Sequence, residues 1–390
     1  MDFETAERSR GTTTPSAEQR TQALDVRRAR LLKAFHDAGY RSVETPLLFP
    51  SATFLDFSGE AIRSRLFLTT DAAGRELCVR PEYTIPVCLA FIDSGLCGKQ
   101  ASYAYCGPVF RAEADGPGQR LQAGLESFGR DDTASADAEV LVIAVQAAAQ
   151  AGFSDIAVRT GDAGLLARLL DVLDVPANWQ RRLKRGLDQG LGAAAVAAAP
   201  PPTGPDHSGV VAALTGTDQN GARALVEDLL SIAGIATVGG RSAGEIAERF
   251  LTQVAAKASP GFGDEQRRVI ERYLRITGPL DDAASQLRSL AADAGLDLEA
   301  ALDLFEERTN FLAVHDLAVD SLTFDGAFAR NLDYYTGFIF EARRARGEVV
   351  IGGGRYDRLA QSLGAAEPVA AVGASIWVER LLEAKDAADA

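Results

Sequence analysis

Hydrophobic residues recur at helical spacing near the start of the chain and predict a first helix over residues 17–38. The apolar side chains that share one face of it are Leu24, Leu31, Leu32 and Phe35. Gly39 follows the last of them, and a glycine here commonly ends a helix by adopting the left-handed conformation. Residues 45–50 then carry two prolines around an apolar run, which excludes a helix and predicts an extended segment.

Shorter apolar runs separated by turn residues predict strands that pair with their neighbours in sequence. The predicted pairs join residues 66–70 to 76–79, residues 102–113 to 121–129, and residues 338–341 to 348–351. Further strands are predicted at residues 155–160 and 322–324, and residues 372–382 predict a strand or turn that runs into a helix. Helices are predicted over residues 86–92, 135–151 and 163–173.

The long stretch over residues 175–316 has a mostly helical pattern, is rich in Ala and Leu, and carries no catalytic constellation. Prolines and glycines interrupt it at residues 200–202 and 259–261. We therefore predict a flexible lead over residues 1–16, a core formed by residues 17–174 and 317–390, and a mainly helical insertion over residues 175–316.

Composition narrows the class of protein. The chain has 390 residues, is 47% hydrophobic and carries a net charge of −14, so it repels a phosphate backbone unless a local basic patch compensates. It has no apolar run of about 18 residues and no apolar signal core, which predicts a cytoplasmic protein without a membrane span. Its four cysteines form no Cys-x-x-Cys pair and its three histidines are far apart, so no metal site is expected.

A first group of polar residues, Glu82 and Thr84, follows the strand at residues 76–79. In an extended chain, residues two apart face the same way, so the two side chains together could bind an ammonium group. The alternative is a solvated Glu82 that caps the helix beginning near Pro86.

A second group lies on the hairpin over residues 102–129. Arg111 lies at the end of one arm, while Gln122, Gly124 and Glu126 alternate along the other and therefore share one face. A small residue between two polar ones leaves room for a ligand, so this hairpin is a candidate polar pocket. Solvated residues at a sheet edge are the alternative.

A third group, over residues 330–335, contains Arg330, Tyr334 and Tyr335 and precedes the last predicted hairpin. The returning strand ends in three glycines, residues 352–354, which permit either a close approach of the backbone to a ligand or a sharp turn. The alternative to a binding site is a tyrosine-rich hairpin that ends in a glycine turn.

Taken together, these segments resemble the catalytic core of class II aminoacyl-tRNA synthetases, and within that class histidyl-tRNA synthetase. The resemblance covers roughly residues 17–173 and 320–383 and implies an α+β fold, an antiparallel sheet flanked by helices, with a helical insertion. The three class motifs match the segment around Pro46, which in the class is a dimer interface, residues 110–113, and residues 373–380 with Arg380. The histidine pocket matches residues 80–84, 122–126 and 330–335.

The resemblance implies a role for each candidate site residue. Glu82, Thr84 and Gln122 would hold the α-ammonium group of histidine. Glu126 and a tyrosine, either Tyr334 or Tyr335, would bind the imidazole. Arg330, with Arg111 as the second candidate, would bind the carboxylate, because a planar guanidinium matches it.

Three departures from the synthetase pattern point to a relative of it. The chain ends after the third motif, where a synthetase continues into an anticodon-binding domain; the loop between Arg111 and Gln122 is short; and Val378 stands where a glycine is expected, so that a bulky side chain there could block the adenine or ribose of ATP. This combination resembles the regulatory subunit of ATP phosphoribosyltransferase, the first enzyme of histidine biosynthesis.

That second resemblance implies a non-catalytic protein with no cofactor, no catalytic residue and no tRNA partner. It would form a homodimer within a hetero-oligomer, activate a short catalytic subunit and bind histidine for feedback inhibition. Because Arg330 and Arg380 are both present, a histidine-activating enzyme remains the alternative. A third interpretation is a scaffold with a vestigial pocket.

Overall fold

The computed structural model describes most of the chain. The described residues are 16–58, 60–113, 118–153, 156–198, 263–315, 317, 322–329, 334–345 and 347–381, with short pieces at 224, 228, 237–238 and 241–242. The predicted lead before Ser16 and the candidate Arg330 lie outside them, as do the predicted breaks at residues 200–202 and 259–261.

The chain divides into two compact units. One is formed by Met1–Arg168 together with Arg275–Ala390, and the other by Leu169–Leu274. The first unit contains the large sheet, and helix α6 (Ala163–Val172) runs from the first unit into the second.

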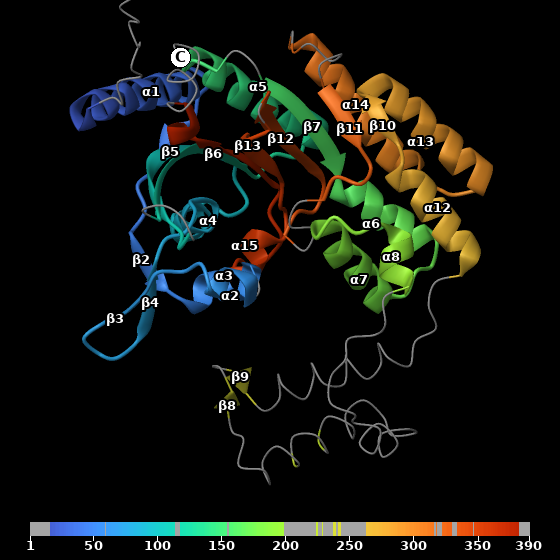
Figure 1. Cartoon of the computed structure of the whole chain (residues 1–390), viewed down its shortest axis with the longest axis horizontal. Helices are drawn as coiled ribbons and strands as arrows, with labels where there is room; N and C mark the ends of the chain where they lie inside the picture. Colours follow the sequence, from blue (N-terminus) through green and yellow to red (C-terminus); the bar gives the residue numbers. More distant parts are fainter. Residues whose placement is uncertain are drawn as a thin grey trace, which may run out of the picture. The chain divides into compact units, whose positions relative to one another are not determined.

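A nine-stranded sheet forms the centre of the first unit, in the order β1-β5-β6-β14-β13-β12-β7-β11-β10 (Figure 1). Its strands are β1 (Arg41–Ser42), β5 (Ala101–Phe110), β6 (Gln119–Phe128), β7 (Ile156–Asp162), β10 (Thr277–Pro279), β11 (Leu322–Asp325), β12 (Phe338–Arg344), β13 (Val349–Arg355) and β14 (Ala371–Trp377). Only the pairs β1–β5 and β7–β11 are parallel, and the other six are antiparallel. The predicted α+β class is confirmed.

Helices cover both faces of this sheet (Figure 1). The helices of this unit are α1 (Ala17–Asp37), α2 (Ala52–Ser58), α3 (Glu60–Arg63), α4 (Thr84–Asp93), α5 (Thr133–Gln150), α13 (Leu280–Ala294), α14 (Glu299–Val314) and α15 (Leu359–Ser362). Helix α5 packs on β6, β12, β13 and β14, and α1 and α14 pack on α5. Helices α4 and α15 contact each other and lie over the other face, where a core of buried aromatic and aliphatic residues joins them to β5 and β6.

The first helix matches its sequence prediction closely because both of its ends are specified locally. Ser16 and Gln19 form a reciprocal capping box, each side chain bonded to the other residue's backbone N–H. Gly39 follows with φ of +88°, a backbone conformation that side chains with a Cβ atom rarely adopt. Leu31 and Phe35 are the residues of this helix that become fully buried.

A smaller three-stranded sheet of β2 (Leu48–Pro50), β4 (Glu76–Val79) and β3 (Leu68–Thr70) projects from the unit (Figure 1). Strands β3 and β4 form the predicted hairpin, and β2 is the extended segment between the two prolines. Four large apolar side chains on or beside this sheet remain 40–49% exposed: Leu47, Leu48, Phe67 and Leu68.

The glycines at residues 352–354 form the end of β13 and make no turn. A Cβ atom at Gly353 would lie 2.3 Å from the carbonyl oxygen of Gly373 and 2.6 Å from the ring of Phe340. The strands therefore approach too closely for any side chain, and the chain continues in register to Arg355.

The predicted insertion is too long at its C-terminal end. Helices α13 and α14, together with β10, belong to the first unit, and their place in the insertion is corrected accordingly. The physical reason is a buried ion network: Arg308 on α14 donates to Asp162 on β7 at 2.6 Å and to Asp137 on α5 at 3.3 Å. Such contacts between distant segments leave no periodic trace in the sequence.

The second unit contains α7 (Ala177–Asp188), α8 (Ala193–Ala198), α12 (Asp264–Leu274) and a two-stranded ladder of β8 (Thr237–Val238) and β9 (Arg241–Ser242). A Cβ atom at Gly186 would lie 2.2 Å from Val196, so the glycine lets α7 and α8 pack closely. The basic residues of α7 lie away from its buried side, which is formed by Leu183, Gly186 and Leu187.

Candidate functional site

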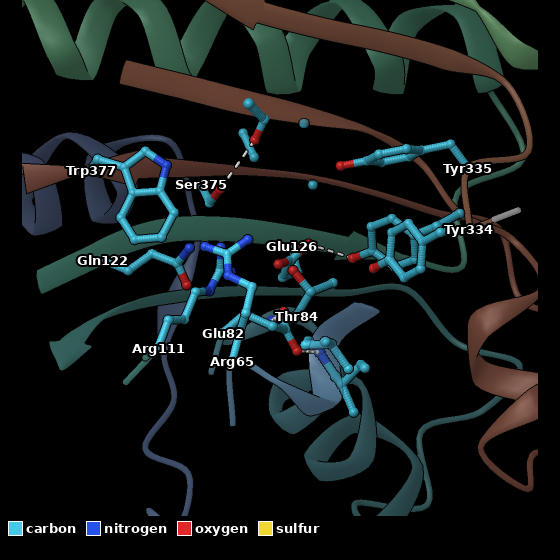
Figure 2. A pocket seen from close by; sticks show the side chains of 17 residues that line it. Arg65, Glu82, Thr84, Arg111, Gln122, Glu126, Tyr334, Tyr335, Ser375 and Trp377 are labelled. Carbon is cyan, nitrogen blue, oxygen red and sulfur yellow. Dashed lines mark hydrogen bonds between the residues drawn. The ribbon is translucent and has the colours of Figure 1, made fainter. Parts of the chain in front are cut away.

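A cavity of about 270 Å³ lies in the first unit between the large sheet and the start of α4 (Figure 2). Of the predicted site residues, it is lined by Glu82, Thr84, Arg111, Gln122, Glu126, Tyr334 and Tyr335. These residues come from segments up to 253 positions apart, Glu82 to Tyr335, and the structure brings all seven together. Arg330, the eighth, lies outside the described residues.

Glu126 lies at the buried end of the cavity and is only 1% exposed. Its carboxylate accepts a short hydrogen bond from the Tyr356 hydroxyl and a longer one, 3.3 Å, from the Tyr105 hydroxyl. Burial raises the pKa of Glu126 from its usual 4.5 to about 8, although the two phenols and Thr84 favour the ionised form. This carboxyl group can therefore take up or release a proton near neutral pH.

Glu82 combines features of the two alternatives that the sequence suggested, because it caps a helix and also lines the cavity. It accepts hydrogen bonds from the backbone N–H groups of Thr84, at 2.6 Å, and Ile85, at 2.9 Å, and so caps α4. It is not solvated like a surface cap, because it also lines the cavity, where burial raises its pKa and the charge of Arg111 opposes that rise. The cavity thus contains two carboxyl groups, Glu126 buried and Glu82 half-buried.

Gln122 is 3% exposed, and its side-chain oxygen accepts a hydrogen bond of 3.2 Å from the backbone N–H of Tyr83. The expected room for a ligand at Gly124 is wrong. A Cβ atom at Gly124 would lie 2.3 Å from the Tyr105 hydroxyl and 2.4 Å from the Ala374 carbonyl, so protein atoms fill that gap. The glycine instead lets Tyr105 reach Glu126.

Three tyrosines line the cavity beside Glu126 (Figure 2). The ring of Tyr334 stacks on that of Tyr356, with centroids 5.4 Å apart, and Tyr335 meets Tyr334 edge-on at 4.9 Å. Tyr356, the direct partner of Glu126, was not among the predicted site residues. It directly follows β13, two positions after Gly354, and extending the alternation of that strand by one residue could have found it.

Two arginines, Arg65 and Arg111, are directed into the end of the cavity nearer Trp377 (Figure 2). Arg111 donates from Nε to the Pro81 carbonyl at 2.7 Å, and its guanidinium lies 5.1 Å from the centre of the Trp377 indole. Arg65 was missed by the sequence analysis, because it follows a short helix and belongs to no alternating pattern.

The bulky residue of the third motif that faces the cavity is Trp377. Residues Gly373, Ser375 and Trp377 alternate along β14 and line the cavity, whereas Val378 is fully buried and is not among the lining residues. Val378 therefore does not face the cavity, and the large side chain of the third motif that does so is Trp377. Arg380 also lies over this indole, 5.4 Å from its centre.

Comparisons with known proteins identify the family of the chain. The family model for histidyl-tRNA synthetase matches residues 15–239 and 221–381. A regulatory subunit of ATP phosphoribosyltransferase from Mesorhizobium japonicum is 39% identical over 92% of this chain and 97% of its own length. The same subunit from Brucella anthropi is 37% identical over 92% of this chain and 94% of its own length.

The chain belongs to the ATP phosphoribosyltransferase regulatory subunit family. A crystal structure described as an ATP phosphoribosyltransferase regulatory subunit/histidyl-tRNA synthetase, from Bacillus halodurans, superposes with a TM-score of 0.67 at 23% identity, covering 98% of this chain and 84% of the other. Histidyl-tRNA synthetase from Nostoc gives 0.63 at 16% identity, covering 99% and 77%. At such identities these two structures show the shared fold.

The described residues include neither a metal-binding cluster nor a membrane-spanning helix. They contain no group of three or more His, Cys, Asp and Glu side chains arranged to hold a metal ion. None of their helices combines the length and the apolar character needed to span a bilayer.

The close approach of Gly373 to the Glu126 carboxylate can be tested by substitution. A Cβ atom at this position would lie 1.5 Å from Oε2 of Glu126, so Gly373→Ala must displace the carboxylate. If histidine binds in the cavity, we expect the variant to bind it at least about 10-fold more weakly in calorimetry, because one charged hydrogen bond contributes roughly 1.5–3 kcal/mol. Gly192→Ala is the matched control, since a Cβ atom there meets nothing within 4 Å; equal affinities for both variants would contradict this geometry.

Proposed function

We propose that this chain is a non-catalytic regulatory subunit of ATP phosphoribosyltransferase that binds histidine in the described cavity. Histidine binding would stabilise an inhibited state of the complex with a short catalytic subunit. To inhibit in this way, histidine must bind the two states of the complex with different affinities.

The observation that carries the proposal is the division of one small cavity into an acidic and a basic end. Its volume of about 270 Å³ lies just below the roughly 300–1,000 Å³ of sites for drug-sized ligands, so it suits a ligand the size of an amino acid. Arginines at one end match a carboxylate, and Glu82 beside them matches an α-ammonium group. These groups select an α-amino acid.

The buried end selects the side chain. Glu126 accepts hydrogen bonds, Tyr356 orients it, and the stacked rings of Tyr334 and Tyr356 offer flat faces beside it. A flat ring with an N–H donor satisfies all three features, and imidazole is the amino-acid side chain of this kind that is small enough to share the cavity with a backbone. Histidine is therefore the proposed ligand.

Titration calorimetry of the whole chain tests this proposal directly. We expect histidine to bind, and phenylalanine, which has a ring but no N–H donor, to bind at least about 100-fold more weakly, because it would leave buried polar groups unpaired. Absence of binding heat with histidine, in a sample with a cooperative unfolding transition, would refute the proposed ligand.

A histidine-activating enzyme is the second candidate, favoured by the presence of Arg111 in the cavity and Arg380 near it. Both guanidiniums lie over Trp377, and Arg380 also donates a short hydrogen bond to the Val349 carbonyl. We therefore expect histidine-dependent ATP–pyrophosphate exchange to stay at background, with a histidyl-tRNA synthetase as the positive control. Exchange above background would favour the enzyme.

The assembly that we propose contains a homodimer of this chain within the hetero-oligomer. The exposed side chains of Leu48 and Phe67 support it, because both lie on the face of the small sheet that carries Val79, and a cluster of exposed large apolar residues commonly marks an interface. Two copies would bury this cluster against each other. Sedimentation equilibrium of the isolated chain checks the dimer.

A further inference from the structure

Arg65 lies on the turn after α3 and lines the basic end of the cavity. Its backbone carbonyl accepts a hydrogen bond of 2.8 Å from the N–H of Ala112, which fixes the residue beside Arg111. Within the described part of the chain, the Arg65 guanidinium forms no hydrogen bond or ion pair, and the side chain is exposed. The turn is thus held in place while the charged group is available.

Among the residues that the structure describes, no carboxylate forms an ion pair with the Arg65 guanidinium. Glu113 is near enough for Arg65 to help lower its pKa, but the larger cause is the hydrogen bond of 2.7 Å that Glu113 accepts from Arg120. Glu82 is the carboxylate near Arg111, and it is engaged by two backbone N–H groups of α4. Two neighbouring guanidiniums at one end of a cavity therefore favour an anionic group between them.

The chemistry of an amino acid fixes where its anionic group must lie. The α-ammonium and α-carboxylate groups share one carbon atom, so a carboxylate lies next to whatever binds the ammonium. If Glu82 binds the ammonium, the carboxylate falls beside Glu82 on the side of Arg111, because the charge of Arg111 already acts on Glu82. Arg65 enters the same end of the cavity (Figure 2).

We propose that Arg65, together with Arg111, binds the α-carboxylate of the amino acid that occupies the cavity. This inference rests on the proposed function, and it deepens it by assigning the carboxylate to a residue outside the motifs. Arg111 is held in place by Pro81 and Trp377, whereas the exposed guanidinium of Arg65 is available to the ligand. A planar guanidinium suits the task because it can form two parallel hydrogen bonds to one carboxylate.

The test compares two ligands on matched variants. Arg65→Met keeps the unbranched aliphatic stem of the arginine and removes the charge. Arg65→Lys keeps the charge and removes the planar guanidinium. Arg75→Met is the control. Arg75 is an exposed arginine paired with Asp71 at 2.6 Å in the turn between β3 and β4, outside the cavity. The ligands are histidine and histidinol, in which a hydroxymethyl group replaces the carboxylate.

We expect Arg65→Met to weaken histidine binding about 10- to 100-fold in calorimetry and to change histidinol binding less than about 3-fold, because only histidine offers a carboxylate. Arg65→Lys should fall between Arg65→Met and the wild type, and Arg75→Met should bind both ligands like the wild type. The preference of the wild type for histidine over histidinol should accordingly shrink in Arg65→Met.

Two outcomes would overturn the inference. Unchanged histidine binding by Arg65→Met would leave the carboxylate to other residues, and equal losses for histidine and histidinol would show a role in shaping the cavity. Both differ from a failure of the proposed function, in which the wild type itself would bind no histidine. Because Arg65 is exposed, its variants should unfold like the wild type, and a thermal melt verifies this.

Discussion

Replacing Glu126 with glutamine is expected to weaken histidine binding strongly and to make the ligand-free protein more stable above neutral pH. Binding weakens because the amide cannot offer a carboxylate to an imidazole N–H, and we expect at least about 100-fold weaker binding by calorimetry. Stability rises because the glutamine removes a carboxyl group that must ionise while buried. A merely damaged protein would not gain stability.

The pH dependence follows from the raised pKa. A carboxyl group with a pKa of about 8 in the folded state and 4.5 when unfolded contributes stability that is complete below pH 4.5 and is lost as the pH rises to 8. Between pH 6 and 8.5 the wild type should lose about 2–3 kcal/mol more than Glu126→Gln in urea unfolding. Parallel pH curves for the two proteins would contradict the assigned environment.

The control for both readouts is Glu348→Gln. This residue lies in the hairpin between β12 and β13, its side chain is 41% exposed, and it pairs with Arg344 at 3.3 Å. We expect it to bind histidine like the wild type and to change the free energy of unfolding by less than about 1 kcal/mol.

Replacing Asp137 with asparagine is expected to cost about 3–5 kcal/mol of stability, the largest single effect on folding that we predict. Asp137 is fully buried on α5 and pairs with Arg355 on β13 at 2.7 Å and with Arg308 on α14 at 3.3 Å. Asparagine keeps the shape but leaves two buried guanidiniums with too little negative charge. Each retains one other carboxylate, Asp357 and Asp162, which favours the lower end of the range.

Urea unfolding at neutral pH measures this cost, and Asp297→Asn is the matched control. Asp297 pairs with Arg168 at 3.4 Å, but its side chain is 82% exposed, so losing this pair should cost less than about 1 kcal/mol. Stability of Asp137→Asn within about 1 kcal/mol of the wild type would contradict a stabilising role for this ion network. Because Arg355 precedes Tyr356, weaker histidine binding should accompany the lost stability.

The parts of the fold that the sequence predicted are those specified by neighbouring residues. The capped helix before Gly39 and the hairpin over residues 102–129 follow from local patterns, and the structure has both. The cavity's lining was predicted for seven residues because motifs quoted from four separate segments pointed to one ligand. The proposed ligand itself remains to be tested.

What the sequence did not predict depends on contacts between distant segments. Tyr356 donates a hydrogen bond to Glu126 from 230 positions away in the sequence. The register of β14 places Trp377, and not Val378, in the cavity. The ion pair of Arg308 with Asp162 joins α14 to the large sheet of the first unit. At Gly124 the sequence prediction was wrong for the same reason. A gap in a strand pattern was interpreted as space for a ligand, but the neighbouring strand fills it with Tyr105.

The most direct measurement of the central claim is the effect of histidine on the phosphoribosyltransferase activity of a short catalytic subunit mixed with this chain. We predict that activity requires this chain, that histidine inhibits the wild-type complex, and that the same histidine concentrations leave the Glu126→Gln complex uninhibited. Catalytic activity that is independent of this chain, or equal inhibition of both complexes, would contradict the account.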